Sequence, residues 1–187
     1  MSHTTEFPVT ASQHWHALRD DLLRYGGWGA LLKEQSLWAV AWFRLGGMLE
    51  RLPSPIRRPV LTLWWLCFRF IEMLTGVSLP LGLQAKGGLR IWHFGNVFVN
   101  SQARLGRNCT LRQGVTIGNR HTNGPSPYIG DDVELGAYAQ VLGDIRIGDR
   151  ARVGAMSVVL HDIPDGATAV GAPARILMHL TAPTTET

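Results

Sequence analysis

The stretch Leu105–Val159 reads LGRNCTLRQGVTIGNRHTNGPSPYIGDDVELGAYAQVLGDIRIGDRARVGAMSVV and repeats with a period of six residues. Steps of six through it reach a branched aliphatic residue everywhere except at Asn123: Leu105, Leu111, Ile117, Ile129, Leu135, Val141, Ile147, Val153 and Val159. A period of six matches neither an amphipathic helix nor an alternating hairpin sheet. Short strands joined by tight turns can stack the same aliphatic position in every coil, so the repeat predicts a parallel β-helix.

The composition supports one globular domain with an elaboration, because the 187 residues are 45% hydrophobic and allow a substantial core. The formal net charge is +4, and only Lys33 and Lys86 of the 18 basic residues are lysines. Arginine favours phosphates and anionic surfaces, since its planar fork binds them bidentately. No basic run interleaved with aromatic residues marks a nucleic-acid module, so we expect no nucleic-acid partner.

The cysteine content indicates a reducing compartment. Cys67 and Cys109 are isolated, which predicts two buried thiols rather than a disulfide framework or a zinc site. The segment Met1–Thr10 lacks the basic and then apolar layout of a secretory signal. We therefore expect a cytoplasmic protein.

A helical arm precedes the repeats. After a frayed tail over residues 1–11, a polar helix is predicted from Ser12, as its N-cap, to about Tyr25, where Gly26 and Gly27 end it. A broad apolar stripe then predicts a second helix over residues 28–51.

A third helix is predicted from Pro59, a good first-turn residue, to Leu74, with Gly76 terminating it. It is apolar almost all round, but Arg69 and Glu72 interrupt the run before the ~20 residues that span a bilayer. Two roles for the Trp-rich arm stay open. It packs against the β-helix and its oligomer partners, or it lies in the interface at the cytoplasmic face of the membrane. In the second role, four cations face anionic lipid: Arg51, Arg57, Arg58 and Arg69.

These patterns divide the chain into three parts. We expect an α-helical arm over residues 1–76, a β-helix over residues 77–180 and a flexible tail over residues 181–187.

One histidine is unusual by its position. His93 lies twelve residues before Leu105, so the count by six assigns it to an aliphatic slot. A structural histidine is the ordinary explanation for a lone His, but a titratable ring in such a slot is costly unless it is hydrogen-bonded. A general base is a reason to keep it there.

Four segments carry a resemblance to a known family: His93–Gly95, Gln113–Gly118, Gly154–Val159 and Val170–Arg175. From Val77 to Arg175 the chain resembles the hexapeptide-repeat acyltransferases, in particular the serine acetyltransferases and their polysaccharide O-acetyltransferase relatives. The resemblance implies a left-handed β-helix, a homotrimer and acetyl-CoA bound between neighbouring subunits. It also implies that His93 is the catalytic base and that no metal is required.

The resemblance also suggests cofactor-binding residues. Small side chains suit the wall that the pantetheine arm passes, and Arg175 is placed to meet a CoA phosphate. The small residues are Gly136, Ala137, Gly154 and Ala155. A turn explains each glycine taken singly, so only the set supports CoA binding.

Two departures from the serine enzymes bear on the acceptor. Those enzymes have an aspartate directly before the catalytic histidine and another fifteen residues before it, where this chain has Trp92 and Ser78. Without these carboxylates the ammonium of serine lacks a partner, whereas a Trp face suits a sugar ring. We therefore expect a saccharide acceptor that contacts Trp92, with the tautomer of His93 set by a hydroxyl such as that of Ser78 or by a backbone carbonyl.

The Gly- and Pro-rich segment Asn119–Tyr128 predicts a loop pushed out of one coil. Arg120 and His121 on it match the Arg-His pair that contacts the acceptor in the serine enzymes, by dipeptide although not by register. The resemblance therefore implies that both residues bind substrate.

Three alternatives remain beside a saccharide acetyltransferase. The first is a serine O-acetyltransferase of cysteine biosynthesis. The second is a non-catalytic β-helix scaffold whose arm recruits partners. The third is a metal-dependent carbonic anhydrase of the β-helix type, which needs three histidines at one metal. Here only His161 joins His93 and His121 in the repeats, so too few ligands are well placed.

Overall fold

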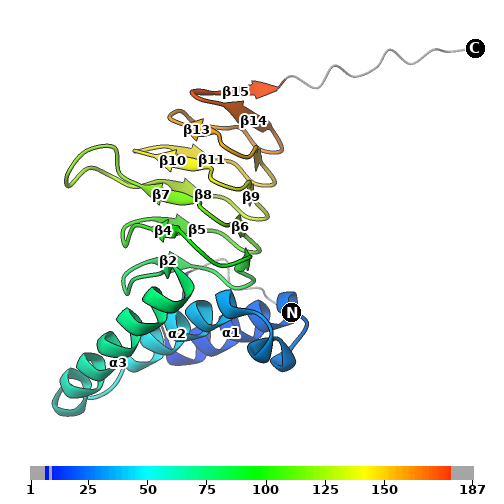
Figure 1. The fold of residues 1–187 in the computed structure, drawn as a ribbon. Coiled ribbons are helices and arrows are strands. Elements are labelled where there is room, and N and C mark those ends of the chain that lie inside the picture. The colour runs from blue at the N-terminus through cyan, green and yellow to red at the C-terminus, as the bar shows by residue number, and fades with distance from the viewer. Residues whose placement is uncertain (1–6, 9, 178–187) are drawn as a thin grey trace, which may run out of the picture.

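The computed structural model describes residues 7–8 and 10–177, in which a helical arm lies across one end of a β-solenoid (Figure 1). The helical elements are α1 (Ala11–Tyr25), the 3₁₀ helix η1 (Trp28–Leu32), α2 (Gln35–Leu49) and α3 (Ser54–Thr75). The strands are β1 (Val77–Ser78), β2 (Gln84–Ala85), β3 (Arg90–Trp92), β4 (Val97–Val99), β5 (Arg104–Leu105), β6 (Thr110–Arg112), β7 (Thr116–Gly118), β8 (Tyr128–Ile129), β9 (Glu134–Leu135), β10 (Gln140–Leu142), β11 (Arg146–Ile147), β12 (Arg152–Val153), β13 (Val158–Val159), β14 (Thr168–Gly171) and β15 (Ala174–Leu177). The tail predicted over residues 181–187 lies outside the described residues.

The strands form three sheets that run along the solenoid. Sheet A has the order β1-β4-β7-β10-β13, sheet B the order β11-β8-β5-β2, and sheet C the order β15-β14-β12-β9-β6-β3. Strands of successive coils pair in parallel, whereas β15 turns back antiparallel on β14 at the last coil. The predicted fold class, a parallel β-helix preceded by an α-helical arm, is confirmed.

The six-residue series forms the core of the solenoid. Leu105 pairs with Ile129 and Leu111 with Leu135, so equivalent residues of successive coils lie on top of one another. All nine aliphatic residues of the series are at most 3% exposed. Burial of one such side chain stabilises the fold by about 1.5–3 kcal/mol, so the stacked rows supply much of the driving force for folding of the solenoid.

The first helix begins earlier than predicted. Thr10 is its N-cap, because the Thr10 hydroxyl accepts from the Gln13 backbone N–H at 3.2 Å and the Gln13 side chain accepts from the Thr10 N–H at 2.9 Å. This reciprocal capping box satisfies two free donors, so Ser12 is not the cap and Ala11 is not part of a frayed tail. Gly26 ends the helix with φ 90°, as predicted.

The second predicted helix is broken into two elements. Glu34 has an extended backbone and separates η1 from α2, which ends at Leu49. The indole N–H of Trp38 donates to the Leu31 carbonyl at 2.6 Å. That bond satisfies a carbonyl near the end of η1 and stabilises the break.

The third helix also begins earlier than predicted, at Ser54. Pro55 occupies its first turn, while Pro59 lies one turn further inside the helix on an exposed face. Pro59 has no N–H to donate to the preceding turn, and the helix tolerates that loss close to its start. Gly76 ends the helix with φ 63°, as predicted.

A buried ion pair joins the arm to the first coil. The Arg44 Nε donates to Asp21 Oδ2 at 2.8 Å, and both side chains are fully buried. The guanidinium also donates to the carbonyls of Ala85 and Lys86, at 2.6 Å each. Asp21 in turn accepts from the Leu89 N–H at 2.7 Å. These bonds fix α1 and α2 against the solenoid.

The two cysteines differ in burial. Cys109 is fully buried, and burial raises the pKa of its thiol to about 12, which makes it an inert core side chain. Cys67 is only partly buried on α3, so its predicted burial is wrong for the single chain. Both are free thiols.

Candidate active site

His93 lies on an exposed corner of the solenoid, between β3 of sheet C and β4 of sheet A. Its predicted place in an aliphatic slot is wrong. The inward residue of β3 is Ile91, which pairs with Leu111, and Val99 of β4 pairs with Ile117. Eight positions separate the inward residues of β3 and β4, whereas six separate those of β6 and β7. The corner therefore holds two additional residues, and the count by six loses its register there.

The corner leaves the imidazole open to solvent. Among the described residues no hydrogen bond fixes its tautomer, from Ser78 or from a backbone carbonyl. The φ of His93 is 65°, but seven other non-glycine residues share a positive φ, so this conformation alone does not mark a site. An exposed ring can approach the hydroxyl of an acceptor that arrives from outside.

The arm contributes to the surroundings of His93. A hollow of about 260 Å³ lies between the corner and the junction of η1 with α2. It is lined by Lys33, Glu34, Gln35, Ser36, His93 and Phe94. The polar residues of this junction form no recognisable motif in the sequence. They become neighbours of His93 only through the packing of the arm.

The arm also holds the strand that leads to His93. The Ser36 hydroxyl donates to the Ile91 carbonyl at 2.8 Å, and the Tyr25 hydroxyl accepts from the Ile91 N–H at 2.8 Å. Burial raises the pKa of Tyr25, so the phenol stays protonated. These bonds fix β3 and therefore the position of Trp92 and His93 at its end.

A groove of about 570 Å³ runs over the outer face of sheet C. Its wall includes Trp92 and all four small residues assigned to the pantetheine path. The lining consists of Arg24, Trp92, Thr110, Arg112, Glu134, Leu135, Gly136, Ala137, Arg152, Val153, Gly154, Ala155 and Thr168. The structure thus brings five predicted site residues into one concave surface next to His93.

The glycines of this groove have a packing role as well. A Cβ on Gly136 would lie 2.5 Å from the Ala155 nitrogen, and one on Gly154 would lie 2.7 Å from Val170 Cγ1. Close stacking of the coils therefore requires both glycines whether or not a ligand binds. The continuous groove, rather than either glycine, indicates a ligand path.

Trp92 stacks on Arg90 and neighbours Arg112 on the next strand, at the start of the groove. The Arg90 guanidinium is 3.7 Å from the centroid of the Trp92 ring, and Arg112 is the register partner of Trp92 on the next strand. Arg112 and Arg152 also line the groove and are not among the residues predicted from the sequence. Their only signal is the outward position beside an inward aliphatic residue, which solvated surface residues share.

Arg175 stands apart from this groove. It lies on β15, paired with Val170 of β14, and its side chain is exposed. The residue belongs to the end of sheet C but does not line the cavity over that sheet.

Arg120 and His121 lie on the predicted loop, which projects from the solenoid between β7 of sheet A and β8 of sheet B (Figure 1). Both side chains are exposed. The His121 carbonyl accepts from Asn119 Nδ2 at 2.8 Å and from the Gly124 N–H at 2.9 Å, which closes the loop on itself. Sheet A separates this corner from that of His93, so one chain does not bring the two histidines together.

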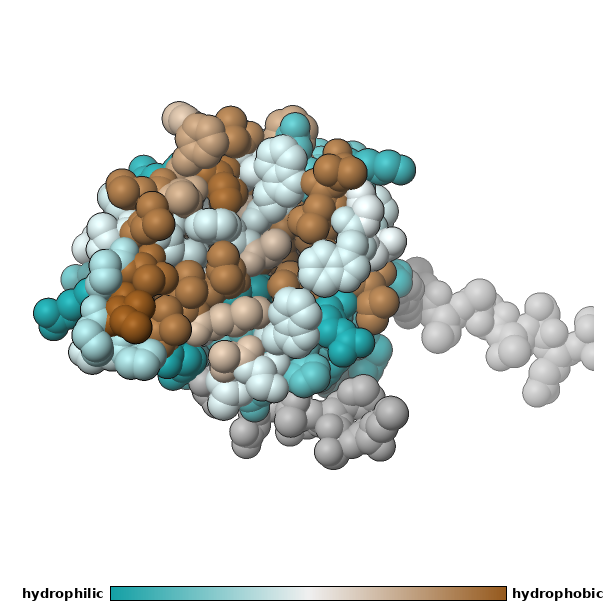
Figure 2. All heavy atoms as spheres, turned by 90° about the horizontal axis from the view of Figure 1, so that it is seen from below, coloured by the Kyte–Doolittle hydropathy of each residue, from teal (hydrophilic) through white to brown (hydrophobic). Residues whose placement is uncertain are grey.

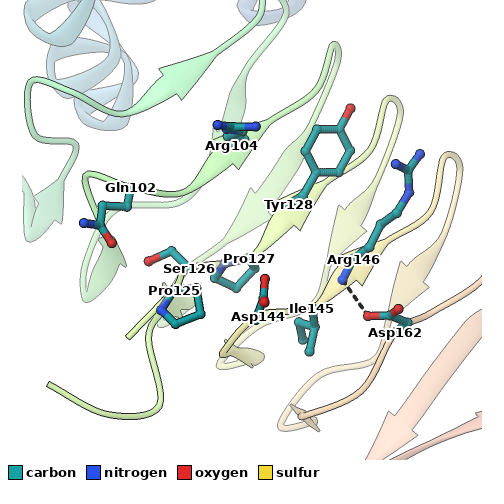
Figure 3. A pocket seen from close by; sticks show the side chains of 10 residues that line it. All are labelled: Gln102, Arg104, Pro125, Ser126, Pro127, Tyr128, Asp144, Ile145, Arg146 and Asp162. Atoms are coloured by element: carbon teal, nitrogen blue, oxygen red, sulfur yellow. Dashed lines mark hydrogen bonds between the residues drawn. The ribbon is translucent and has the colours of Figure 1, made fainter. Parts of the chain in front are cut away.

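A second cavity, of about 520 Å³, lies at the base of this loop (Figure 3). The side chains of Arg104, Tyr128 and Arg146 stand in a row on successive strands of sheet B, and Asp144 lies across from them. The Arg146 guanidinium is 4.9 Å from the Tyr128 ring centroid. This surface was not predicted from the sequence, because strand register alone aligns the three side chains.

No metal centre forms within the described part of the chain, where no three side chains among His, Cys, Asp and Glu come together.

Residues 126–161 match the family model described as "Bacterial transferase hexapeptide (six repeats)". The putative colanic acid biosynthesis acetyltransferase WcaB of Escherichia coli (strain K12) is 48% identical over 87 residues, which are 46% of this chain and 54% of that protein. This chain thus spans about half the length of that relative. The serine acetyltransferase of Helicobacter pylori (strain J99) is 32% identical over 162 residues, 86% of this chain and 91% of that enzyme.

Solved structures of serine acetyltransferases are also similar to this chain. The soybean serine acetyltransferase apoenzyme has a TM-score of 0.77 and 32% identity, over 89% of this chain and 69% of that chain. A serine acetyltransferase in complex with CoA has a TM-score of 0.75 and 26% identity, over 89% of this chain and 70% of that chain. Fold and site define a hexapeptide-repeat β-solenoid with a groove beside an exposed histidine. Together with the relatives, they show that the chain belongs to the hexapeptide-repeat transferase family, among its serine acetyltransferase-like members.

Proposed function

We propose that this protein is an O-acetyltransferase that moves an acetyl group from acetyl-CoA to a hydroxyl of a saccharide, as a step in capsule or exopolysaccharide formation. The observation that carries the proposal is the groove that begins at Trp92, directly before His93, and continues past two Gly-Ala pairs. An aromatic face suits the apolar face of a sugar ring. A wall of small residues lets an extended pantetheine arm lie close to the backbone.

His93 acts as the general base in this proposal. As the acceptor oxygen attacks the thioester carbonyl carbon, the imidazole takes the hydroxyl proton and the new C–O bond forms. A backbone N–H stabilises the oxyanion of the tetrahedral intermediate. The C–S bond then breaks, and the imidazolium returns the proton to the departing CoA sulfur. Atoms and charge balance without a metal or a redox partner.

Positive charge along the groove suits the phosphates of CoA. Arg112 and Arg152 line it, and Glu134 pairs only loosely with Arg152, at 3.9 Å. Arg175 at the end of the same sheet extends the basic surface. A guanidinium binds a phosphate bidentately, so these residues are the proposed phosphate contacts.

The proposed assembly is a homotrimer with the acetyl donor in the groove between subunits. His93 and the loop with Arg120 and His121 lie at two corners that border sheet A. If the three subunits turn sheet A toward the threefold axis, the loop of one subunit approaches the neighbouring subunit's His93. In this arrangement the loop residues contact the acceptor across the interface.

Serine O-acetyltransfer is the second candidate, and one observation favours it. Glu34 lines the hollow beside His93 and is a carboxylate that can pair with the ammonium of an amino acid. The arm thus supplies a charge that Trp92 and Ser78 do not. Glu34→Gln separates the two candidates, because it should lower acetylation of serine by about fivefold and leave that of a neutral sugar within about twofold.

The decisive experiment is a thiol-release assay with acetyl-CoA across monosaccharides, glycan repeats and L-serine. Acceptor-dependent release with a saccharide and none with serine is the expected outcome. Efficient acetylation of serine would overturn the saccharide assignment. A chain that binds CoA but never releases thiol with any acceptor would instead be the non-catalytic scaffold.

A further inference from the structure

Exposed hydrophobic side chains are concentrated on the helical end of the molecule (Figure 2). Twelve of the 19 large hydrophobic residues that are exposed in the described chain belong to the arm. They are Trp15, Leu23, Trp28, Leu32, Trp38, Ile56, Leu63, Trp65, Leu66, Phe70, Met73 and Leu74. Scattered exposed apolar residues are ordinary, but a contiguous apolar surface indicates a site that binds another protein or a membrane.

The helix α3 supplies the largest part of this surface. At about 100° per residue, the exposed apolar residues of this helix other than Trp65 fall on one side, away from Trp64, which packs inward at 3% exposure. The stripe consists of Ile56, Leu63, Leu66, Phe70, Met73 and Leu74, which are between 48% and 74% exposed. Both sides of this 22-residue helix are thus apolar, and only the inward side has a partner in the described chain.

Cationic residues border the stripe. Between positions 51 and 71 the chain carries Arg51, Arg57, Arg58 and Arg69, of which Arg69 forms an ion pair with Glu72. Arg57 lies seven residues before Trp64 and therefore falls on the inward side of the helix. Arg58 and Arg69 fall with Thr62 on the strip of α3 between the apolar stripe and the buried side. In Figure 2 the brown side chains lie over the arm, while much of the teal lies at the rim.

A second apolar feature lies on the same helix. A shallow hollow of about 340 Å³ is lined by Leu61, Thr62, Trp64, Trp65 and Leu81, where α3 meets the first coil. A hollow with this lining suits a hydrocarbon chain rather than a polar ligand.

We infer that α3 lies in the plane of an anionic membrane, with its apolar stripe in the interface and Arg58, on the border of that stripe, at the lipid phosphates. None of the described helices is long and apolar enough to cross a bilayer, which leaves the in-plane orientation for a helix of this kind. Each arginine near an anionic surface gains attraction, whereas symmetric pairing of α3 with a second copy brings like charges together. The inference rests on the proposed function only for its purpose, which is to place the enzyme beside a lipid-linked glycan acceptor.

The test is flotation of the full chain with vesicles of phosphatidylcholine alone and of phosphatidylcholine mixed equally with phosphatidylglycerol. The protein should float with the anionic vesicles and leave them as ionic strength approaches about 1 M, where the Debye length is ~3 Å. The double variant Leu63→Ser/Leu66→Ser should lower the partition coefficient about 10-fold or more. Arg58→Gln should weaken binding to the anionic vesicles alone.

Ile176→Ser/Leu177→Ser is the matched control, since these residues are 45% and 50% exposed on β15 at the opposite end of the solenoid. It should float like the unchanged protein. If the unchanged protein does not bind anionic vesicles, the inference is overturned. A different outcome is that the unchanged protein forms a large assembly by light scattering, the stripe variant does not, and neither protein binds vesicles. This outcome would overturn the inference and show that the face joins copies of the chain instead. Thiol release with a soluble acceptor, measured in parallel, separates this outcome from failure of the proposed function.

Discussion

At the scale of single residues, His93 gives the sharpest test of the proposed chemistry. Loss of a general base lowers turnover by about 10²–10⁴-fold. His93→Ala should show this loss in the thiol-release assay while calorimetry still detects CoA binding, because the groove over sheet C stays intact. His161→Ala is the control, since His161 is exposed near the last coil. Turnover near the unchanged level in a folded His93→Ala protein would remove His93 from the mechanism.

His14 makes stability depend on pH. Burial, followed by the charges of Arg44 and Arg51, lowers its pKa from 6.5 to about 4. The ring is 8% exposed and packs against Gly47, where a Cβ would lie 2.3 Å from it. The unfolded chain therefore binds the proton more strongly, and the folded state loses stability as pH falls from 6.5 to about 4.

This loss amounts to roughly 3 kcal/mol at most. Urea titrations at steps across that pH range measure it. His14→Leu should flatten the dependence, whereas the same change at the exposed His16 should leave it in place. A His14→Leu protein that still loses stability as steeply on acidification would contradict this origin.

Residue identity alone was insufficient to place His93. The six-residue count failed at its corner because two additional residues enter between β3 and β4, and nothing in the local composition marks an insertion. By contrast, the nine aliphatic positions were predictable, since burying a branched side chain in every coil leaves a strict period. The family resemblance singled out His93 as a candidate base, whereas the prediction of a buried aliphatic slot for it was wrong.

At the scale of elements, the junction of arm and solenoid depends on the Asp21–Arg44 pair. Asp21→Asn leaves the Arg44 guanidinium buried without a countercharge, which costs about 3–5 kcal/mol. Chemical denaturation should show this loss. Asp20→Asn is the neighbouring control, because Asp20 is 45% exposed in its bridge to Arg107 and should change stability by less than about 1 kcal/mol. Equal stability of the two variants would contradict the proposed role of the buried pair.

The helix boundaries illustrate how far element prediction from sequence reaches. Gly26 and Gly76 were predicted as helix ends, since a left-handed C-cap strongly favours glycine. The starts were missed because capping competes among nearby residues. Thr10 with Gln13 forms a better cap than Ser12, and α3 accepts Pro59 inside its exposed face.

At the scale of the whole molecule, the two candidate half-sites lie at different corners of one chain. Trp92 and His93 end β3, while Arg120 and His121 lie on the loop after β7. The hollow near Glu34 and the row of Arg104, Tyr128 and Arg146 likewise come from the packing of distant segments. Sequence motifs indicated the two candidate half-sites, but whether they come together depends on how the subunits assemble.

Mixed assemblies test whether the half-sites meet between subunits. His93→Ala lacks the base, and Arg120→Ala/His121→Ala lacks the loop contacts, so each alone should have low turnover. If the site forms between the His93 corner of one subunit and the neighbouring loop, trimers from equal amounts of both variants contain about one quarter intact interfaces. Refolding the two variants together should therefore restore activity to well above the mean of the separate samples. Light scattering on the mixture checks that the assembly is a trimer. Activity equal to that mean, in a verified mixed trimer, would show that the loop does not act across the interface.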